Sequence, residues 1–294
     1  MFDRLQNIAA WKGHGFTACG NSAALKGHGF SRADRCAKMR GALAPAGLVL
    51  ALCLVALPAA RAQQTLRLAA AADLEPLLPP VLAAFQQQTG IQVEPSFKSS
   101  AVLATEIING APFDLFMAAD LSFPQCVVDA GKAEESHPVP YARGTLVLWT
   151  RNDSGIPTLS LDALRSPAIK SIAVANAQHA PYGRAAQATL QHLHLDAAVQ
   201  SRLVIAENIA QAAQYADSGN AQVGFISLTS ALTPQLQADG HFLRVPADDY
   251  PPLIQGAVVV RGSAHAAAAR KFLDFLQTPQ VGRMLSTRGL EPIL

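Results

Sequence analysis

Short apolar runs alternate with helical patterns along residues 64–294, and this alternation constrains the fold more than any other feature of the sequence. A strand-like run at 66–69 is followed by one apolar helix face, formed by Leu74, Leu77, Leu78, Val81, Leu82 and Phe85. Pro79 and Pro80 predict a kink or break in that helix, because proline cannot donate the helical hydrogen bond. Alternation of this kind is typical of an α/β fold with mostly parallel sheets.

The predicted elements form two sets. The first has strands at 66–69, 91–94 and 114–117, with helices at 74–85, at 101–109 and from 121. The second has strands at 145–149, 171–175, 203–206 and 222–226, with helices at 182–193 and 209–218. An extended stretch at 250–260 leads into helices at 264–277 and 280–287, which have no sheet of their own. We therefore expect two lobes, at 63–143 and 144–261, with 262–294 returning to the first. A single large doubly wound sheet is the alternative.

Residues 46–60 form an uncharged apolar stretch, preceded by Arg40 and followed by Arg61 and Ala62. This pattern predicts a secretion signal with an Ala-x-Ala cleavage site that ends at Ala62. Its length of about 15 residues is less than the roughly 20 that a membrane-spanning helix needs. The signal fits best over 39–62, so we expect translation to start at Met39 and the mature protein to be periplasmic. Residues 1–38, which contain Lys-Gly-His-Gly-Phe twice, fit no secretory pattern, and a short functional repeat is the alternative interpretation of this segment.

Removing residues 1–62 changes the charge and the cysteine content of the chain. The remaining residues hold 15 of the 23 Lys and Arg and 19 of the 21 Asp and Glu, a net charge of −4. A mildly acidic chain without a basic stripe gives no support to nucleic-acid or membrane-surface binding. Cys126 is the one cysteine left, so the mature chain cannot form an intramolecular disulfide and depends on its apolar core.

Four loops have the form expected of an anion site, in which a strand ends and a helix begins. They are Ala72-Asp73, residues 98–100, residues 180–183 and residues 207–209, two in each set. Helix N-termini present free N–H groups and the positive end of the helix dipole. A crevice lined by four such loops suits a small, oxygen-rich anion. For Ser99 and Tyr182 the plainer interpretations are a helix cap and a packed aromatic ring.

Enzymatic interpretations find little support. The sequence has no Gly-x-Ser-x-Gly elbow, Walker loop, Rossmann glycine fingerprint or His-Glu-x-x-His motif. His192 and His194 are two residues apart and would point to different faces of a helix, which disfavours a metal site. We therefore expect a protein that is not an enzyme and that has neither a cofactor nor a metal site.

Residues 64–294 resemble the periplasmic molybdate-binding proteins of ABC importers, which have the type II solute-binding fold. The resemblance lies in AAAADL, PSFKSSAVLATEIINGAPFDLFMAAD, HAPYGRAA, AENIAQA and FLDFLQTPQVGRMLSTRGL, and its most specific block is 96–120. It implies a protein that captures molybdate or tungstate between two lobes. The partner that it implies is a membrane permease, and we expect a monomer.

The resemblance also implies the ligand-binding residues: Asp73, Ser100, Tyr182 and Ile209. Tyr182 would supply the tyrosine hydroxyl that other members take from a later strand, where this chain has Ser227. Asp73 departs from the family, since many members have Ser, Thr or Asn there. A carboxylate beside a dianion would be strongly unfavourable in a dry cleft. We therefore expect the Asp73 carboxylate to cap its own helix, and its N–H to face the ion.

The tetrapeptide Ala-Ala-Asp-Leu occurs at 71–74 and again at 118–121, each time between a strand and a helix. Both aspartates are therefore expected to be helix caps first, and Asp120 is expected to bind no ion. Alternatives for the whole protein remain. One is capture of another oxyanion, such as phosphate, a phosphonate or sulfate, with Asp73 accepting a hydrogen bond from a protonated ligand. The others are a secreted enzyme and a sensor domain.

Overall fold

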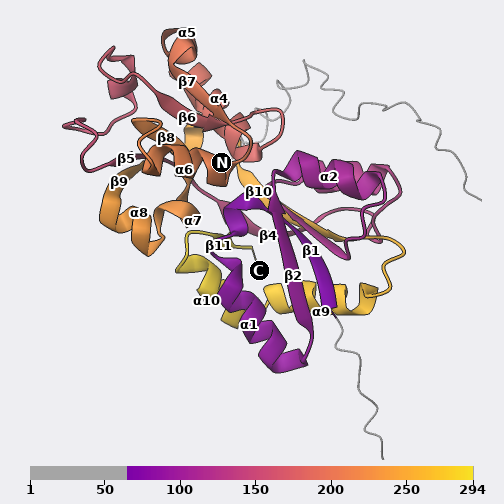
Figure 1. The fold of residues 1–294 in the computed structure, drawn as a ribbon. Helices are drawn as coiled ribbons and strands as arrows, with labels where there is room; N and C mark the ends of the chain where they lie inside the picture. Colours follow the sequence, from indigo (N-terminus) through magenta and orange to yellow (C-terminus); the bar gives the residue numbers. More distant parts are fainter. Residues whose placement is uncertain (1–64, 294) are drawn as a thin grey trace, which may run out of the picture. The chain divides into compact units, whose positions relative to one another are not determined.

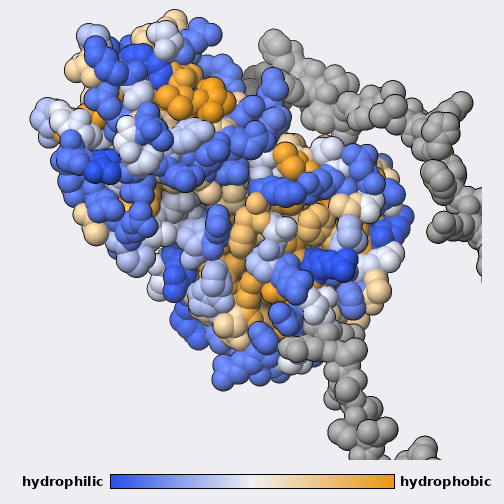
Figure 2. Space-filling model, in the orientation of Figure 1, coloured by the Kyte–Doolittle hydropathy of each residue, from blue (hydrophilic) through white to orange (hydrophobic). Residues whose placement is uncertain are grey.

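The computed structural model describes residues 65–293 (Figure 1). The predicted secretion signal at 39–62 and its cleavage site lie outside the described residues. None of the helices within 65–293 is long and apolar enough to cross a membrane. Hydrophilic residues cover most of the face that Figure 2 shows, with smaller apolar patches between them.

The first lobe is built on a six-stranded sheet with the order β11-β4-β10-β3-β1-β2. Its strands are β1 (Thr65–Ala71), β2 (Gln92–Lys98), β3 (Leu115–Ala118), β4 (Val139–Gly144), β10 (Leu253–Val259) and β11 (Glu291–Pro292). One face packs on α1 (Leu78–Thr89), α9 (Ala266–Leu276) and α10 (Pro279–Ser286), and the other on α2 (Ser100–Ile108) and α3 (Ser122–Asp129). Alternation along β3 supplies both cores, since Leu115 and Met117 join the first and Phe116 joins the second.

The second lobe is built on a five-stranded sheet with the order β7-β6-β8-β5-β9. Its strands are β5 (Leu146–Arg151), β6 (Ile172–Ala175), β7 (Leu203–Ala206), β8 (Val223–Ser227) and β9 (Gly240–Arg244). Its α-helices are α4 (Pro181–His192), α5 (Asp196–Val199), α6 (Ile209–Asp217), α7 (Leu228–Ala231) and α8 (Pro234–Asp239). Its short 3-10 helices are η3 (Asp162–Arg165), η4 (Gln200–Arg202) and η5 (Ala247–Asp249), and η2 (Ala72–Leu74) belongs to the first lobe. Two separate sheets confirm the two-lobed α/β prediction over a single large sheet.

The sheets are mixed, which corrects the prediction of mostly parallel sheets. Parallel pairing is confined to β2-β1-β3 and to β7-β6-β8, and the remaining neighbours pair antiparallel. β10 pairs with β3 and β4, so the chain returns to the first lobe before 262, although the sequence placed 144–261 in the second. The chain therefore crosses between lobes twice, from β4 to β5 and again ahead of β10.

The predicted helix at 74–85 divides in two, and the prolines explain why. A 3-10 turn over Ala72–Leu74 ends the first strand, and α1 begins only at Leu78, with Pro79 and Pro80 in its first turn. The N–H groups of the first turn have no acceptor within the helix, so proline, which lacks an N–H, costs little stability there. The break thus precedes the prolines, and it leaves Asp73 in a short turn instead of a long helix.

Gly183 lets α4 pack closely on the end of β6, and we predict that Gly183→Ala destabilises the protein. A Cβ at this position would lie 2.3 Å from the carbonyl oxygen of Ala175, which is backbone and cannot move aside freely. Overpacking of this kind should lower the free energy of unfolding by about 1–3 kcal/mol, as measured by urea denaturation. Gln187→Ala, at an exposed position of the same helix, is the control and should change it by less than about 0.5 kcal/mol. Equal midpoints for the two variants would contradict the close approach.

Candidate functional site

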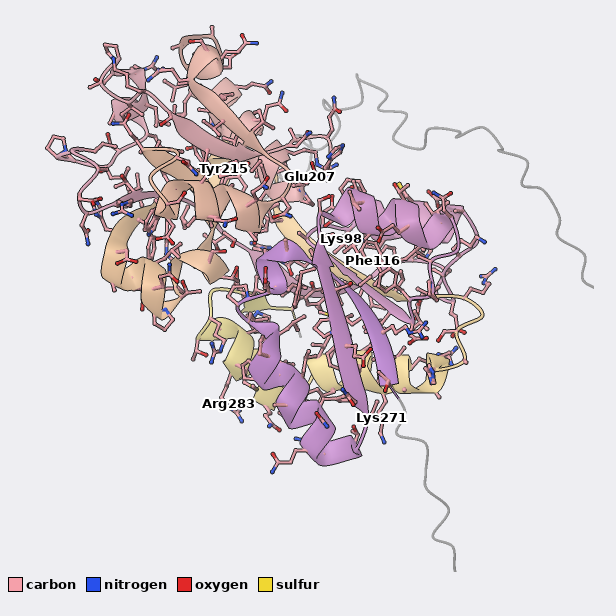
Figure 3. The ribbon with its side chains drawn as sticks, in the orientation of Figure 1. Lys98, Phe116, Glu207, Tyr215, Lys271 and Arg283 are labelled. Carbon is pink, nitrogen blue, oxygen red and sulfur yellow. The ribbon has the colours of Figure 1, made fainter. Side chains whose placement is uncertain are left out.

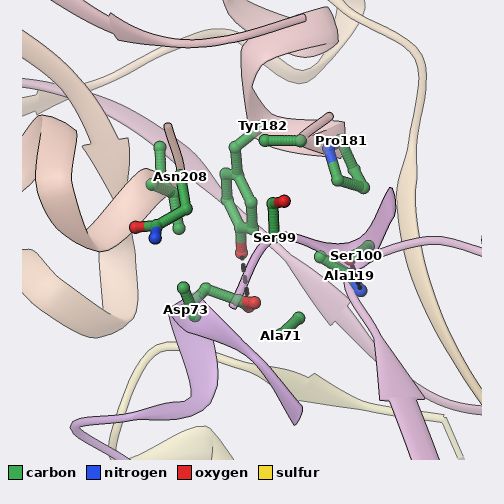
Figure 4. A pocket seen from close by; sticks show the side chains of 11 residues that line it. Ala71, Asp73, Ser99, Ser100, Ala119, Pro181, Tyr182 and Asn208 are labelled. Carbon is green, nitrogen blue, oxygen red and sulfur yellow. Dashed lines mark hydrogen bonds between the residues drawn. The ribbon is translucent and has the colours of Figure 1, made fainter. Parts of the chain in front are cut away.

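A single pocket brings the four predicted loops together (Figure 4). All four predicted site residues, Asp73, Ser100, Tyr182 and Ile209, line it. The other lining residues are Ala71, Ala72, Ser99, Ala119, Ala180, Pro181 and Asn208. These residues follow the carboxyl ends of β1, β2, β3, β6 and β7, where open α/β sheets bind ligands.

Three helices begin at this pocket: α2 at Ser100, α4 at Pro181 and α6 at Ile209. First-turn N–H groups lack intrahelical acceptors and carry the positive end of the helix dipole. The Asn208 side chain caps α6 by accepting the N–H of Gln211 at 2.9 Å, which fixes the direction of that helix start. Because none of the described lining residues is Lys, Arg or His, the positive potential here comes from backbone dipoles.

Two adjacent serines present hydroxyls at the start of α2. Ser100 Oγ accepts the N–H of Ala119 at 3.2 Å, which orients the hydroxyl and leaves its own proton available to donate. Ser99 occupies the N-cap position but makes no side-chain capping bond, and its buried Oγ has no partner. The capping interpretation of Ser99 is therefore wrong, and Ser99 lines the pocket beside Ser100, in one of the four predicted loops.

Asp73 belongs to a buried hydrogen-bond network. Its Oδ2 accepts hydrogen bonds from Gln255 Nε2 at 2.5 Å and from the Tyr182 hydroxyl at 3.3 Å (Figure 4). Gln255 is held in turn by Tyr141, whose hydroxyl donates to Gln255 Oε1 at 2.7 Å. Gln255 and Tyr141 are polar groups of β10 and β4 that the sequence analysis did not single out. The network links the first lobe to α4 of the second.

The carboxylate of Asp73 makes no capping bond to its own helix, so the predicted capping role is wrong. Burial raises the pKa of Asp73 from 3.8 to about 7, against the opposing effect of the hydrogen bonds from Gln255 and Tyr182. The burial of two tyrosines near this carboxyl group raises the pKa of both Tyr141 and Tyr182 well above 10, so both stay protonated. The orientation of the Asp73 N–H toward an ion remains a prediction.

Asp120 bonds to the start of the following helix, as the predicted capping role requires. Its Oδ1 accepts the N–H of Phe123 in the first turn of α3 at 3.2 Å, and it does not line the pocket. Ser227, the alternative position for a site hydroxyl, accepts the N–H of Ser230 and also lies outside the pocket. Within 65–293, no group of three or more His, Cys, Asp or Glu could hold a metal ion.

Comparison with known proteins identifies the family. The model of the bacterial extracellular solute-binding proteins matches residues 66–291. The chain belongs to this family. It is 34% identical to the molybdate-binding protein ModA of Rhodobacter capsulatus over 235 residues, which cover 80% of this chain and 90% of that protein.

Solved structures agree with this assignment to the solute-binding family. The periplasmic molybdate-binding protein of Azotobacter vinelandii superposes with a TM-score of 0.72 at 30% identity, covering 78% of this chain and 99% of that one. The sulfate-binding protein SubI of Mycobacterium tuberculosis superposes with a TM-score of 0.65 at 19% identity, covering 78% and 87% of the two chains, and shows the fold alone. Solute-binding proteins of this architecture close two lobes around a ligand.

Side chains and backbone groups join the two lobes around the pocket of this solute-binding protein. Thr229 Oγ1, in the second lobe, donates to the carbonyl oxygen of Asp73 at 2.7 Å. The N–H of Ala101, in the first lobe, donates to the carbonyl oxygen of His179 at 3.1 Å. These contacts fix the first-lobe turn and the start of α2 directly against the second lobe.

An ion pair outside the pocket adds a third link between the lobes. Arg184 of α4 pairs with Asp120, and its guanidinium lies 4.9 Å from the centre of the Phe123 ring. Lys98 is paired with Glu106 at 2.5 Å instead of facing the pocket. Figure 3 labels Lys271 on α9 and Arg283 on α10, and neither residue lines the pocket. Of these basic side chains, Arg184 links the two lobes, and none of them lines the pocket.

We predict that Asp73→Asn stabilises the ligand-free protein at high pH. The unfolded chain loses the Asp73 proton near pH 3.8 and the folded protein near pH 7, so the stability contributed by this proton falls between those values. The amide avoids the buried charge. At about pH 8 the variant should therefore unfold at a higher urea concentration than the wild type. Its free energy of unfolding should be larger by up to about 4 kcal/mol. At about pH 4 the difference should largely disappear. A difference that does not depend on pH would contradict the raised pKa.

We also predict that the Arg184 ion pair favours the closed arrangement of the lobes. Arg184→Met keeps an aliphatic stem beside Phe123 but removes the charge. The closed-to-open ratio should fall by up to about fivefold, since partly exposed pairs contribute about 0.2–1 kcal/mol. Small-angle X-ray scattering should show a larger radius of gyration for this variant. Arg151→Met, which breaks a pair with Asp153 inside the second lobe, is the matched control. Identical scattering from both variants would exclude the role assigned to Arg184.

Proposed function

We propose that this solute-binding protein captures molybdate, or the closely matched tungstate, and delivers it to an ABC permease. One observation carries the proposal: three helix N-termini and two serine hydroxyls converge on one pocket between two lobes, without a basic side chain in the lining. The relatives named above, at 34% and 30% identity, are themselves molybdate-binding proteins.

Neutral donors suit a small dianion in a closed cleft. Backbone N–H groups at helix starts and hydroxyls stabilise its charge without a counter-ion that would itself need desolvation. Within the proposal, Ser100 donates its hydroxyl, and Tyr182 and Ile209 offer backbone N–H groups from the first turns of α4 and α6. The Tyr182 hydroxyl, which the resemblance assigned to the ion, donates to Asp73 in this structure. Ser99, whose buried hydroxyl has no partner, is a further donor. Because the donors are fixed on both lobes, closure of the lobes would favour ions of one size.

The transport cycle in this proposal needs no chemistry on the ligand. The protein works outside the cytoplasm as a monomer, without cofactor or catalysis, and the lobes close on the ion through their two crossovers. The contacts of Thr229, His179 and Arg184 across the cleft define the closed form. The permease recognises that form and opens it to release the ion.

Titration calorimetry with molybdate, tungstate, sulfate and phosphate tests the proposal. We predict heat of binding with molybdate and tungstate and weaker or no heat with sulfate and phosphate, because the donors are fixed at one spacing. Ser100→Ala removes one hydrogen bond to a charged ligand, so the dissociation constant should rise about 10- to 100-fold.

Ser286→Ala is the matched control for this titration. Ser286 is an exposed serine of α10 whose hydroxyl bonds only to the carbonyl oxygen of Gly282, and its loss should leave the affinity unchanged. Clear binding of another ligand with no heat from molybdate would refute the proposed function. Equal affinities of the two serine variants would refute the role of Ser100.

A further inference from the structure

Asp73 leaves one oxygen without a partner at the pocket. Oδ1 is buried and accepts no hydrogen bond, whereas Oδ2 accepts one from Gln255 and one from Tyr182. The residue is completely buried, and it lines the pocket together with Ser99 and Ser100. A buried polar atom that lacks a partner in the protein is expected to find one in a bound ligand or water.

Among residues 65–293, no basic side chain pairs with this carboxyl group. The elements around it carry further titratable groups: Arg67 on β1, Glu94 and Lys98 on β2, Tyr141 and Arg143 on β4, Tyr182, Arg184 and His192 on α4, and Tyr215 and Asp217 on α6. Lys98 is paired with Glu106, and Arg184, further along α4, is paired with Asp120. Within 65–293, the side chains that donate to the carboxylate are those of Gln255 and Tyr182, and both are neutral.

An ionised Asp73 and a doubly charged oxyanion would repel each other in this pocket. The repulsion is much stronger away from water than in it, and no neighbouring charge offsets it. A single proton on Oδ1 removes the charge of the carboxylate and turns Oδ1 into a donor that can face the ion. Oδ2 keeps both of its hydrogen bonds in that state.

We infer that the pocket binds its oxyanion together with one proton, held between Oδ1 of Asp73 and an oxygen of the ion. The inference rests on the oxyanion capture proposed above and adds a protonation step to it. Solvent supplies the proton, so the ionised carboxylate, the dianion and one proton combine into a complex with two negative charges. The pKa of about 7 that burial gives to Asp73 makes this proton available near neutral pH.

Calorimetry in buffers of different ionisation enthalpy counts the protons that accompany binding. Molybdate titrated into the wild-type protein at about pH 8 should take up close to one proton per ion, and at about pH 5.5 almost none. The dissociation constant should rise about tenfold for each pH unit above the pKa of Asp73 and stay level below it. Asp73→Asn should bind with no proton uptake and with an affinity that does not change over this range.

Asp120→Asn is the matched control, because Asp120 stands in the same tetrapeptide but outside the pocket. This variant should still take up one proton per ion, whatever its affinity. Molybdate binding to the wild type without proton uptake overturns the inference and leaves the proposed function intact. Uptake that persists in Asp73→Asn, or disappears in Asp120→Asn, also overturns it. The absence of any molybdate binding overturns the proposed function together with the inference.

Discussion

A buried carboxyl group without a counter-cation is the constraint on which the arrangement of this pocket depends. Asp73 is held by Gln255 from β10 and Tyr182 from α4, and its carbonyl oxygen accepts from Thr229. Its three partners thus come from both lobes. Gly144, at the first crossover, belongs to the same arrangement, since a Cβ there would lie 2.3 Å from the Tyr182 hydroxyl. The Tyr182 hydroxyl can lie this close to the crossover only because residue 144 has no side chain.

The mixed sheets explain how four distant loops reach one place. The parallel strands β1, β2 and β3 of the first sheet and β6 and β7 of the second end in the loops that line the pocket. β4, β5 and β10 stand at the two crossovers between the lobes, and each has an antiparallel neighbour. β10 serves both purposes, because it returns the chain to the first sheet and carries Gln255 to the carboxyl group of Asp73. The strand that reconnects the lobes therefore also supplies a hydrogen bond that lowers the pKa of Asp73 against the larger effect of burial.

Patterns in the sequence predicted the features that depend on neighbouring residues, which are the strands, the helices and the loops between them. Period and turn residues located the strands and helices that flank the pocket, and the rule that ligands gather at strand ends drew attention to the loops of Tyr182 and Ile209. Gln255 was missed because it lies 182 residues from Asp73, and no local pattern marks a strand glutamine as a partner. Ser99 was assigned a capping bond on helix statistics, and the structure gives its hydroxyl no such bond. The mixed sheets were missed because pairing direction is a property of the whole fold.

The repeated Ala-Ala-Asp-Leu shows most directly where local reasoning stops. Asp120 is 13% exposed at its side chain, bonds to a first-turn N–H and pairs with Arg184, as a cap near a positive side chain should. Asp73 has the same neighbours in sequence but is completely buried, where the loss of water outweighs the hydrogen bonds that favour ionisation. Identical tetrapeptides thus give one side chain that pairs with an arginine and one carboxyl group whose pKa is raised to about 7 by burial. The difference comes from the second lobe and from β10, which bury Asp73 and supply its partners without supplying a positive charge.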